Sequence, residues 1–190
     1  MTQQARVGVF GGSFNPPHVG HVLAAAYLLS VQAVDLLLVI PVFRHPFAKQ
    51  LAPYPDRLAM CQLAMEWLPS VEVSDIEGRL GGESRTLATI EALLQEEPNR
   101  ALRLIIGADV LKDRESWHRF DQIAELAPPL ILGRAGVDHP EAPAAVLPAV
   151  SSTQIRDLVA GGHIADCSAL LPAAVHRYLV EHQLYGGARS

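Results

Sequence analysis

The segment with the most chemical potential lies near the N-terminus and reads Gly11-Gly12-Ser13-Phe14-Asn15-Pro16-Pro17-His18-Val19-Gly20-His21. Glycines let a backbone approach a ligand closely, and a helix beginning near His18 would present unpaired N–H groups and a positive dipole end. In its first turn, His18 and His21 would share one face and point towards the same ligand. The residue types and their spacing therefore predict a phosphate site at which two imidazoles stabilise charge.

Other interpretations of the histidine pair stay open at this point. One imidazole could cap the helix or pack on the loop. A metal pair is a third interpretation, but two ligands without Cys, Asp or Glu at matching spacing do not make a closed metal site. The chain also lacks the motifs G-x-x-x-x-G-K-S/T and G-x-G-x-x-G, which argues against P-loop and dinucleotide-oxidoreductase chemistry.

The elements that must position these residues alternate along the chain. Five short apolar runs are predicted as strands: Val7–Phe10, Leu36–Ile40, Val71–Val73, Leu102–Ile106 and Leu130–Leu132. Apolar residues at helical spacing predict helices over 19–32, 55–67, 86–96, 114–126, 152–160 and 172–183. Trp67 falls at this spacing with Leu63 and is expected in the core.

Near-continuous apolar strands separated by helices imply a parallel sheet with helices on both faces. We therefore predict an α/β fold with a single Rossmann-like, doubly wound, mainly parallel sheet. Residues 1–190 would form one domain that ends in a helical part over about 151–185. Sheets of this kind bind ligands beyond the carboxyl ends of their strands, which is where the glycine and histidine segment falls.

Composition excludes several classes of protein. The chain has 190 residues, of which 49% are apolar and 18% charged, and its net charge is −5, so one folded domain is expected and disorder is not. A pI near 5.9 argues against nucleic acid as a partner. The N-terminus lacks a signal peptide's layout, the apolar runs are too short to span a membrane, and Cys61 and Cys167 form no disulfide or zinc pattern. A cytoplasmic protein fits best, and its oligomeric state is not predicted.

The glycine and histidine segment resembles the G-T/S-F-D/N-P-x-H-x-G-H signature of the HxGH nucleotidylyltransferases. Within that superfamily it is most similar to the bacterial nicotinate mononucleotide adenylyltransferases. A second segment, Ser151-Ser152-Thr153-Gln154-Ile155-Arg156, resembles the superfamily's S-S-T-x-I-R signature. The segment Ile105–Asp109 with Trp117, and the ending Leu171–Tyr185, extend the resemblance over nearly the whole chain.

The resemblance implies attack of a mononucleotide's phosphate on the α-phosphorus of ATP, with pyrophosphate leaving and Mg²⁺ held mainly by the phosphates. Its implied catalytic residues are His18, His21 and Arg156. The residues implied for ATP binding are Gly11, Gly12, Ser13, Phe14, Gly107, Asp109, Ser151, Ser152 and Thr153. From the residues alone, the Ser-Ser-Thr run could be an ordinary helix cap, and Asp109 could cap the helix that follows it.

The acceptor would be a pyridine mononucleotide, with Trp117 stacked on its ring. The chain departs from the family in two places near this site. The loop after the second strand contains Arg44, His45 and Lys49 but lacks the usual P-P-H-K/R cluster, so these residues could contact phosphate or face solvent. Arg85 replaces the tyrosine of S-Y-T, and could pair with a nicotinate carboxylate, while Thr86 could contact the acceptor or cap a helix.

Nicotinate mononucleotide is the expected acceptor. Nicotinamide mononucleotide or another phosphorylated compound is the alternative acceptor. The alternative function is a nucleotide-binding sensor without turnover.

Overall fold

Five parallel strands form the central sheet of the computed structural model, which describes residues 4–45, 51–111, 117, 119–137, 139–140 and 143–186. The strands are β1 (Arg6–Gly12), β2 (Leu36–Pro41), β3 (Val71–Val73), β4 (Ala101–Gly107) and β5 (Pro129–Leu132). They lie in the order β3-β2-β1-β4-β5, and every neighbouring pair is parallel. The predicted fold class and all five predicted strands are therefore confirmed.

Helices connect these strands, and further helices follow the last strand in the chain. They are α1 (Val19–Ser30), α2 (Tyr54–Met65), α3 (Ile76–Leu80), α4 (Thr86–Glu96), α5 (Phe120–Leu126), α6 (Ser152–Ala160) and α7 (Ala173–Glu181), with a 3-10 helix over Ile164–Cys167. The six predicted helices are present, and those predicted over 19–32, 55–67 and 172–183 are shorter than predicted. Of the helix predicted over 114–126, residues 114–116 and 118 lie outside the described residues. Helix α3 was not predicted, because five residues are too few to show a helical period. In the part of the chain that the structure describes, no helix has the length and apolar character needed to span a membrane.

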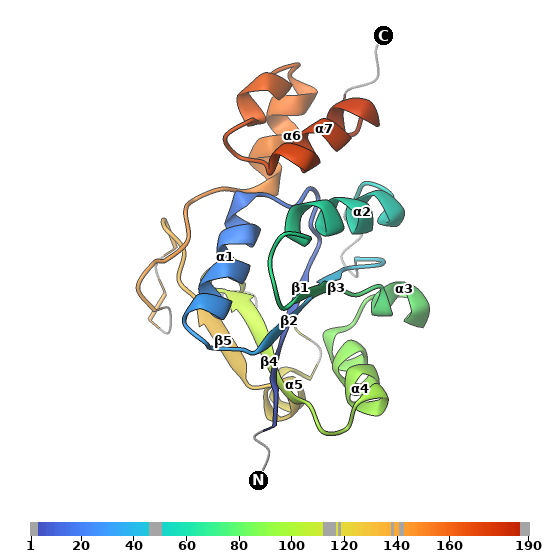
Figure 1. The fold of residues 1–190 in the computed structure, drawn as a ribbon, viewed down its shortest axis with the longest axis vertical. Coiled ribbons are helices and arrows are strands. Elements are labelled where there is room, and N and C mark those ends of the chain that lie inside the picture. The colour runs from blue at the N-terminus through green and yellow to red at the C-terminus, as the bar shows by residue number, and fades with distance from the viewer. Residues whose placement is uncertain are drawn as a thin grey trace.

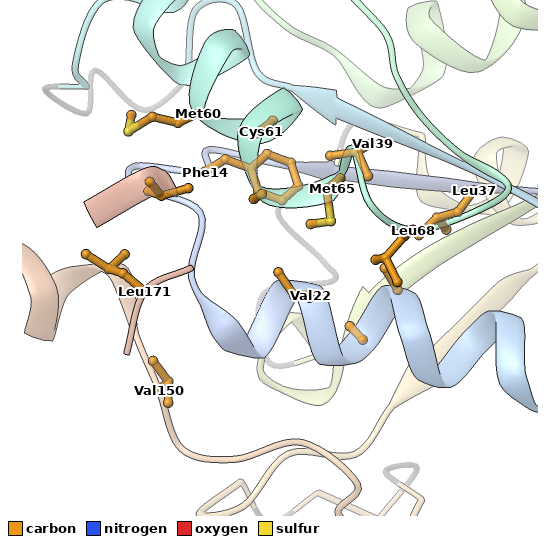
Figure 2. Packing of buried hydrophobic residues seen from close by; sticks show 14 of the residues in the cluster. Phe14, Val22, Leu37, Val39, Met60, Cys61, Met65, Leu68, Val150 and Leu171 are labelled. Atoms are coloured by element: carbon orange, nitrogen blue, oxygen red, sulfur yellow. The ribbon is translucent and has the colours of Figure 1, made fainter. Parts of the chain in front are cut away.

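Alternate residues of the strands pack on the two faces of the sheet. Leu37 and Val39 of β2 lie in one core cluster with α1, α2 and the C-terminal helices, whereas Leu38 and Ile40 lie in the other with α3, α4 and α5. Figure 2 shows the first cluster, where Val22 of α1 faces Met65 of α2 and Phe14 lies under Cys61. Helices on both faces fix the sheet, so the loops at its carboxyl edge have a rigid base.

Trp67 does not belong to the core, so that prediction was wrong. Its side chain is 64% exposed, and its indole Nε1 donates a hydrogen bond to the Ala64 carbonyl at 3.1 Å. Helix α2 ends at Met65, so the helical spacing that relates Trp67 to Leu63 no longer applies.

The C-terminal helices dock on the loop that follows β1. Ser152 Oγ donates to the Pro16 carbonyl at 2.8 Å, Arg156 donates to the Asn15 carbonyl at 2.9 Å, and the Tyr185 hydroxyl donates to Asn15 Oδ1 at 2.7 Å. Asn15 is itself buried. Figure 1 shows α6 and α7 at the end of the molecule opposite the N-terminus. The last elements of the chain therefore meet the first loop, while the single domain over 1–190 stays a prediction.

Candidate active site

The strand order places two loops side by side at the carboxyl edge of the sheet. The chain leaves β1 towards β2 on one side, and β4 lies on the other side of β1. Such a reversal opens a crevice between the loops that follow the two strands, and ligands of open α/β sheets bind there. Gly11 and Gly12 end β1, and Gly107 ends β4. The sequence-predicted loops thus meet at the point where this fold binds ligands.

His18 and His21 form a stacked pair at the start of α1. Their ring centroids lie 3.8 Å apart with an interplanar angle of 29°. The backbone N–H of His18, the N-cap residue, donates to Nδ1 of His21 at 3.1 Å. Because Nδ1 accepts, a neutral His21 carries its proton on Nε2. The pair shares a face, as predicted, and the cap leaves the second nitrogen of His21 as a donor.

Both imidazoles are held neutral. Burial, and to a smaller extent the charge of Arg134, lower the pKa of His18 to about 4. Burial also lowers the pKa of His21 well below its ordinary value, with smaller effects from His18 and Arg134. In addition, Nδ1 of His18 is buried without a hydrogen-bond partner among the described residues. At pH 7 the free protein therefore presents two neutral rings rather than two cations.

Phe14 supports this pair from inside the core. Its side chain is 2% exposed, and its ring lies 4.8 Å from that of His21 and 5.6 Å from that of Phe10. A side chain on Gly12 would come within 3.1 Å of the Phe14 ring, which accounts for glycine at that position. Phe14 was expected to line an ATP site, but the residue is buried and its ring packs against His21.

Arg134 joins this site from the carboxyl end of β5, and sequence reasoning missed it. Its guanidinium lies 3.8 Å from Asp109 Oδ2 and donates to the Val150 carbonyl. Its positive charge contributes to lowering the pKa of both histidines, for which burial is the larger cause. The signal was available, because Arg134 follows the last apolar run by two residues, at the sheet edge where ligands bind.

Asp109 follows β4 in a 3-10 turn over 108–111. Its carboxylate folds back over Gly107, where a side chain would come within 2.4 Å of Oδ1. Gly107 and Asp109 thus lie at the carboxyl end of β4, as predicted.

The second signature lies against the first. Ser151 caps α6 by accepting from the Gln154 N–H at 3.1 Å, so the Ser-Ser-Thr run does cap a helix, which begins at Ser152 as predicted. Arg156 donates to Thr153 Oγ1 at 3.1 Å and to the Asn15 carbonyl. Because Asn15 precedes His18 in the same loop, the guanidinium of Arg156 lies beside the histidine segment.

A cleft of about 820 Å³ opens next to Gly11, Gly12 and Ser13, here called the glycine loop. Its lining includes Gly11, Gly12 and Ser13 together with His45, Arg85, Thr86 and Trp117. The Trp117 ring packs edge-on against Phe120, with centroids 5.9 Å apart. Four of the six residues predicted to bind the acceptor therefore share one cleft with the predicted ATP loop.

Arg85 pairs with Glu83 at 3.0 Å, and both side chains are about half exposed at 50% and 59%. Arg85 is also the N-cap residue of α4, so the interpretation of Thr86 as the cap was wrong. Arg44 is exposed, with its guanidinium 5.6 Å from the centre of the Phe43 ring. Lys49, the remaining predicted residue of this loop, lies outside the described residues.

The fold and the site define a nucleotide-binding α/β protein built around a paired-histidine loop. The chain belongs to the cytidylyltransferase-like family, which matches residues 9–158, and within it to the nicotinate-nucleotide adenylyltransferases. It is 42% identical to a probable nicotinate-nucleotide adenylyltransferase of Anaeromyxobacter dehalogenans strain 2CP-C, over 98% of this chain and 100% of the relative. It is 41% identical to one of Myxococcus xanthus over the full length of both chains.

The fold also matches a solved structure. This is the Plasmodium falciparum nicotinic acid mononucleotide adenylyltransferase complexed with NaAD, with a TM-score of 0.82 over 95% of this chain and 97% of that one, at 16% identity. At that identity the likeness shows the fold alone. The family predicted from the two signatures is thus confirmed, and the chain is a nucleotidyltransferase.

Proposed function

We propose that this chain transfers the adenylyl group of ATP to nicotinate mononucleotide, giving the deamido dinucleotide and pyrophosphate. The observation that carries the proposal is that the loop ending in the paired histidines also lines, through Gly11, Gly12 and Ser13, the cleft that Trp117 and Thr86 line. The acceptor class is supported by full-length relatives that are 41–42% identical and bear the name nicotinate-nucleotide adenylyltransferase.

The reaction needs alignment and charge stabilisation more than proton transfer. An oxygen of the acceptor's phosphate attacks the α-phosphorus of ATP, and the bond from that phosphorus to the bridging oxygen of the β-phosphate breaks. The attacking oxygen is already anionic at neutral pH, so no general base is required. Neutral His18 and His21 would donate hydrogen bonds to phosphate oxygens whose charge changes in the transition state.

The remaining ATP contacts would come from three loops at the carboxyl edge of the sheet. Asp109 would accept from the ribose hydroxyls, and Arg156 and Arg134 would face the phosphates with planar guanidinium groups. The backbone at Gly11, Gly12, Ser13 and Phe14 and the start of α6 at Ser151, Ser152 and Thr153 would complete the site. Asn15 and Val150 carbonyls hold the two guanidinium groups in place before ATP binds.

On the acceptor side, Trp117 would stack on the pyridine ring, and Thr86 and Arg85 would meet its substituent. Arg44, His45 and Lys49 would contribute to binding the acceptor's phosphate. Because Glu83 neutralises Arg85 in the free protein, a carboxylate-bearing acceptor would have to compete with that pair.

Mg²⁺ would enter with the triphosphate. No group of three or more His, Cys, Asp or Glu side chains among the described residues could hold a metal ion, and Mg²⁺ commonly binds through phosphates and water. The ion would reduce the negative charge of the phosphates. A cytoplasmic location, in keeping with two buried free thiols at Cys61 and Cys167, stays a prediction.

Pyrophosphate release from Mg-ATP tests the proposal directly. Purified protein would be assayed in parallel with nicotinate mononucleotide, nicotinamide mononucleotide and phosphopantetheine. Turnover that is greatest with the nicotinate compound is expected. Preference for another acceptor would overturn the assigned substrate but retain adenylyl transfer, and ATP binding without turnover on any acceptor would favour a sensor.

A further inference from the structure

One carboxylate in the cleft is buried and used by none of the contacts proposed above. Glu77, in α3, is 7% exposed and lines the cleft. Its Oε2 accepts from the Phe43 backbone N–H at 2.9 Å, and its Oε1 accepts from Thr89 Oγ1 at 3.1 Å. Among the described residues it makes no ion pair. A carboxylate that is buried with two neutral donors costs free energy to desolvate, so Glu77 is a candidate for a role beyond packing.

The other side of Phe43 is held by a buried cation. Arg57 is 1% exposed, and its guanidinium donates to the Phe43 carbonyl at 3.4 Å and to the Ser13 carbonyl at 3.0 Å. Its Nε donates to the Ala52 carbonyl at 2.9 Å. The Phe43 N–H is therefore bound by the buried Glu77, and the Phe43 carbonyl is bound by the buried Arg57. Arg57 also contacts Ser13, in the loop that follows β1.

Ser84 ties the same segment to the start of α4. Its Oγ accepts from the N–H groups of Phe43 and Arg44, at 2.9 and 3.2 Å, and its own N–H donates to the Arg44 carbonyl at 2.9 Å. Arg85 and Thr86 follow directly, and His45 follows Arg44. The loop that carries His45 and the start of α4 are thus joined at Phe43 and Ser84, and Glu77 accepts from the same Phe43 N–H.

We propose that Glu77 is a positioning residue for the acceptor. By fixing the main chain at Phe43, it sets the position of the loop that carries His45 relative to the start of α4, which carries Arg85 and Thr86. Thr89 completes the arrangement, because it donates to Glu77 from α4. The inference rests on the proposed function for the identity of the acceptor. The contacts of Glu77 and Thr89 that fix Phe43, here called the clamp, do not depend on it.

Kinetics of conservative and disruptive variants test the clamp. Glu77→Met removes both acceptor oxygens, and we expect KM for nicotinate mononucleotide to rise about tenfold, with KM for ATP within about twofold of wild type. Glu77→Gln keeps an acceptor oxygen and the shape, so its KM should lie between those of Glu77→Met and wild type. Glu91→Gln, on the exposed face of α4, is the matched control and should leave both KM values unchanged.

Thr89 provides a second test that leaves the carboxylate in place. Thr89→Val removes the hydroxyl at nearly constant shape and should raise the acceptor KM, whereas Thr89→Ser should restore it. If neither Glu77→Met nor Thr89→Val raises the acceptor KM, or if both raise the KM for ATP equally, the proposal is wrong.

Amide hydrogen exchange measures the clamp without substrate. In Glu77→Met, and in Thr89→Val should Glu77→Met not fold, exchange should accelerate at 42–45 and 84–86 while β4 stays protected. Unchanged exchange at 42–45, or equal acceleration throughout the sheet, would overturn the positioning role. Wild-type protein that shows no turnover with nicotinate mononucleotide would refute the proposed function, and exchange would then decide the clamp on its own.

Discussion

His18 and His21 are linked by a hydrogen bond that runs from the backbone N–H of the first to Nδ1 of the second, at 3.1 Å. Because of this contact, the His21 imidazole has two roles. Its Nδ1 caps the first turn of α1, and its Nε2 carries the proton that a phosphate oxygen can accept. The structural and the functional interpretations of His21 are therefore compatible, because they use different nitrogens of one ring.

Removing His18 should slow the chemical step far more than it weakens ATP binding. For His18→Ala we expect kcat to fall about 10²- to 10³-fold, the cost of losing a donor aimed at transition-state charge. ATP affinity, measured by calorimetry, should change only a few-fold. His182→Ala, at the exposed end of α7, is the control. A His18→Ala protein with normal turnover would refute the role.

Acid should destabilise the protein through His18. Its folded pKa of about 4 lies below the ordinary 6.5, so between these values the unfolded chain binds a proton that the folded chain does not. Stability is then present above pH 6.5 and is lost as the pH falls towards 4, by on the order of 2 kcal/mol between pH 7 and pH 5. Urea unfolding at the two pH values should show this loss, and His18→Gln should reduce it. An equal loss in the variant would assign the effect elsewhere.

Arg134 should control the protonation of the histidine pair. In Arg134→Met the pKa of His18 should rise, because a neighbouring positive charge is lost, but should stay below 6.5, because burial is the larger cause. NMR titration of the His18 and His21 ring signals measures the pKa values. Arg177→Met, on the exposed side of α7, should move neither signal. An unaltered His18 pKa in Arg134→Met would contradict the electrostatic coupling.

Arg156 should matter chiefly for ATP. Charged hydrogen bonds contribute roughly 1.5–3 kcal/mol, so Arg156→Ala should raise the KM for ATP by about 10- to 100-fold. The KM for the acceptor should change much less, since the guanidinium lies beside Asn15 and the histidine segment. Arg177→Ala again serves as the control. An unchanged KM for ATP would argue against phosphate contact.

Arg85 should bias the choice between the two pyridine mononucleotides. Because its side chain is half exposed and paired with Glu83, its effect should be modest. We expect Arg85→Ala to lower the kcat/KM ratio of nicotinate over nicotinamide mononucleotide by about two- to fivefold, as for an exposed ion pair. Glu83→Gln should raise the ratio by freeing the guanidinium. A ratio that neither substitution alters would show that Arg85 does not meet the carboxylate.

The local pattern of apolar residues predicted the strands and helices well wherever that pattern is clear. The five apolar runs became strands because continuous apolar residues are stable only when both faces of the sheet are covered. Helix α3 was missed because its five residues carry no period. Trp67 was misplaced for a related reason, since a spacing argument holds only as far as the helix continues, and α2 ends two residues earlier.

The sequence by itself determined the family, the order of the elements and the loops that carry the histidines and Arg156, because these depend on local periodicity and on two ordered signatures. Only the tertiary structure decided that Arg134 lies near His18, that Phe14 faces His21 rather than the cleft, and that Glu77 holds Phe43. These pairs are far apart in the chain or depend on side-chain direction, and packing across the sheet, not local preference, brings them together.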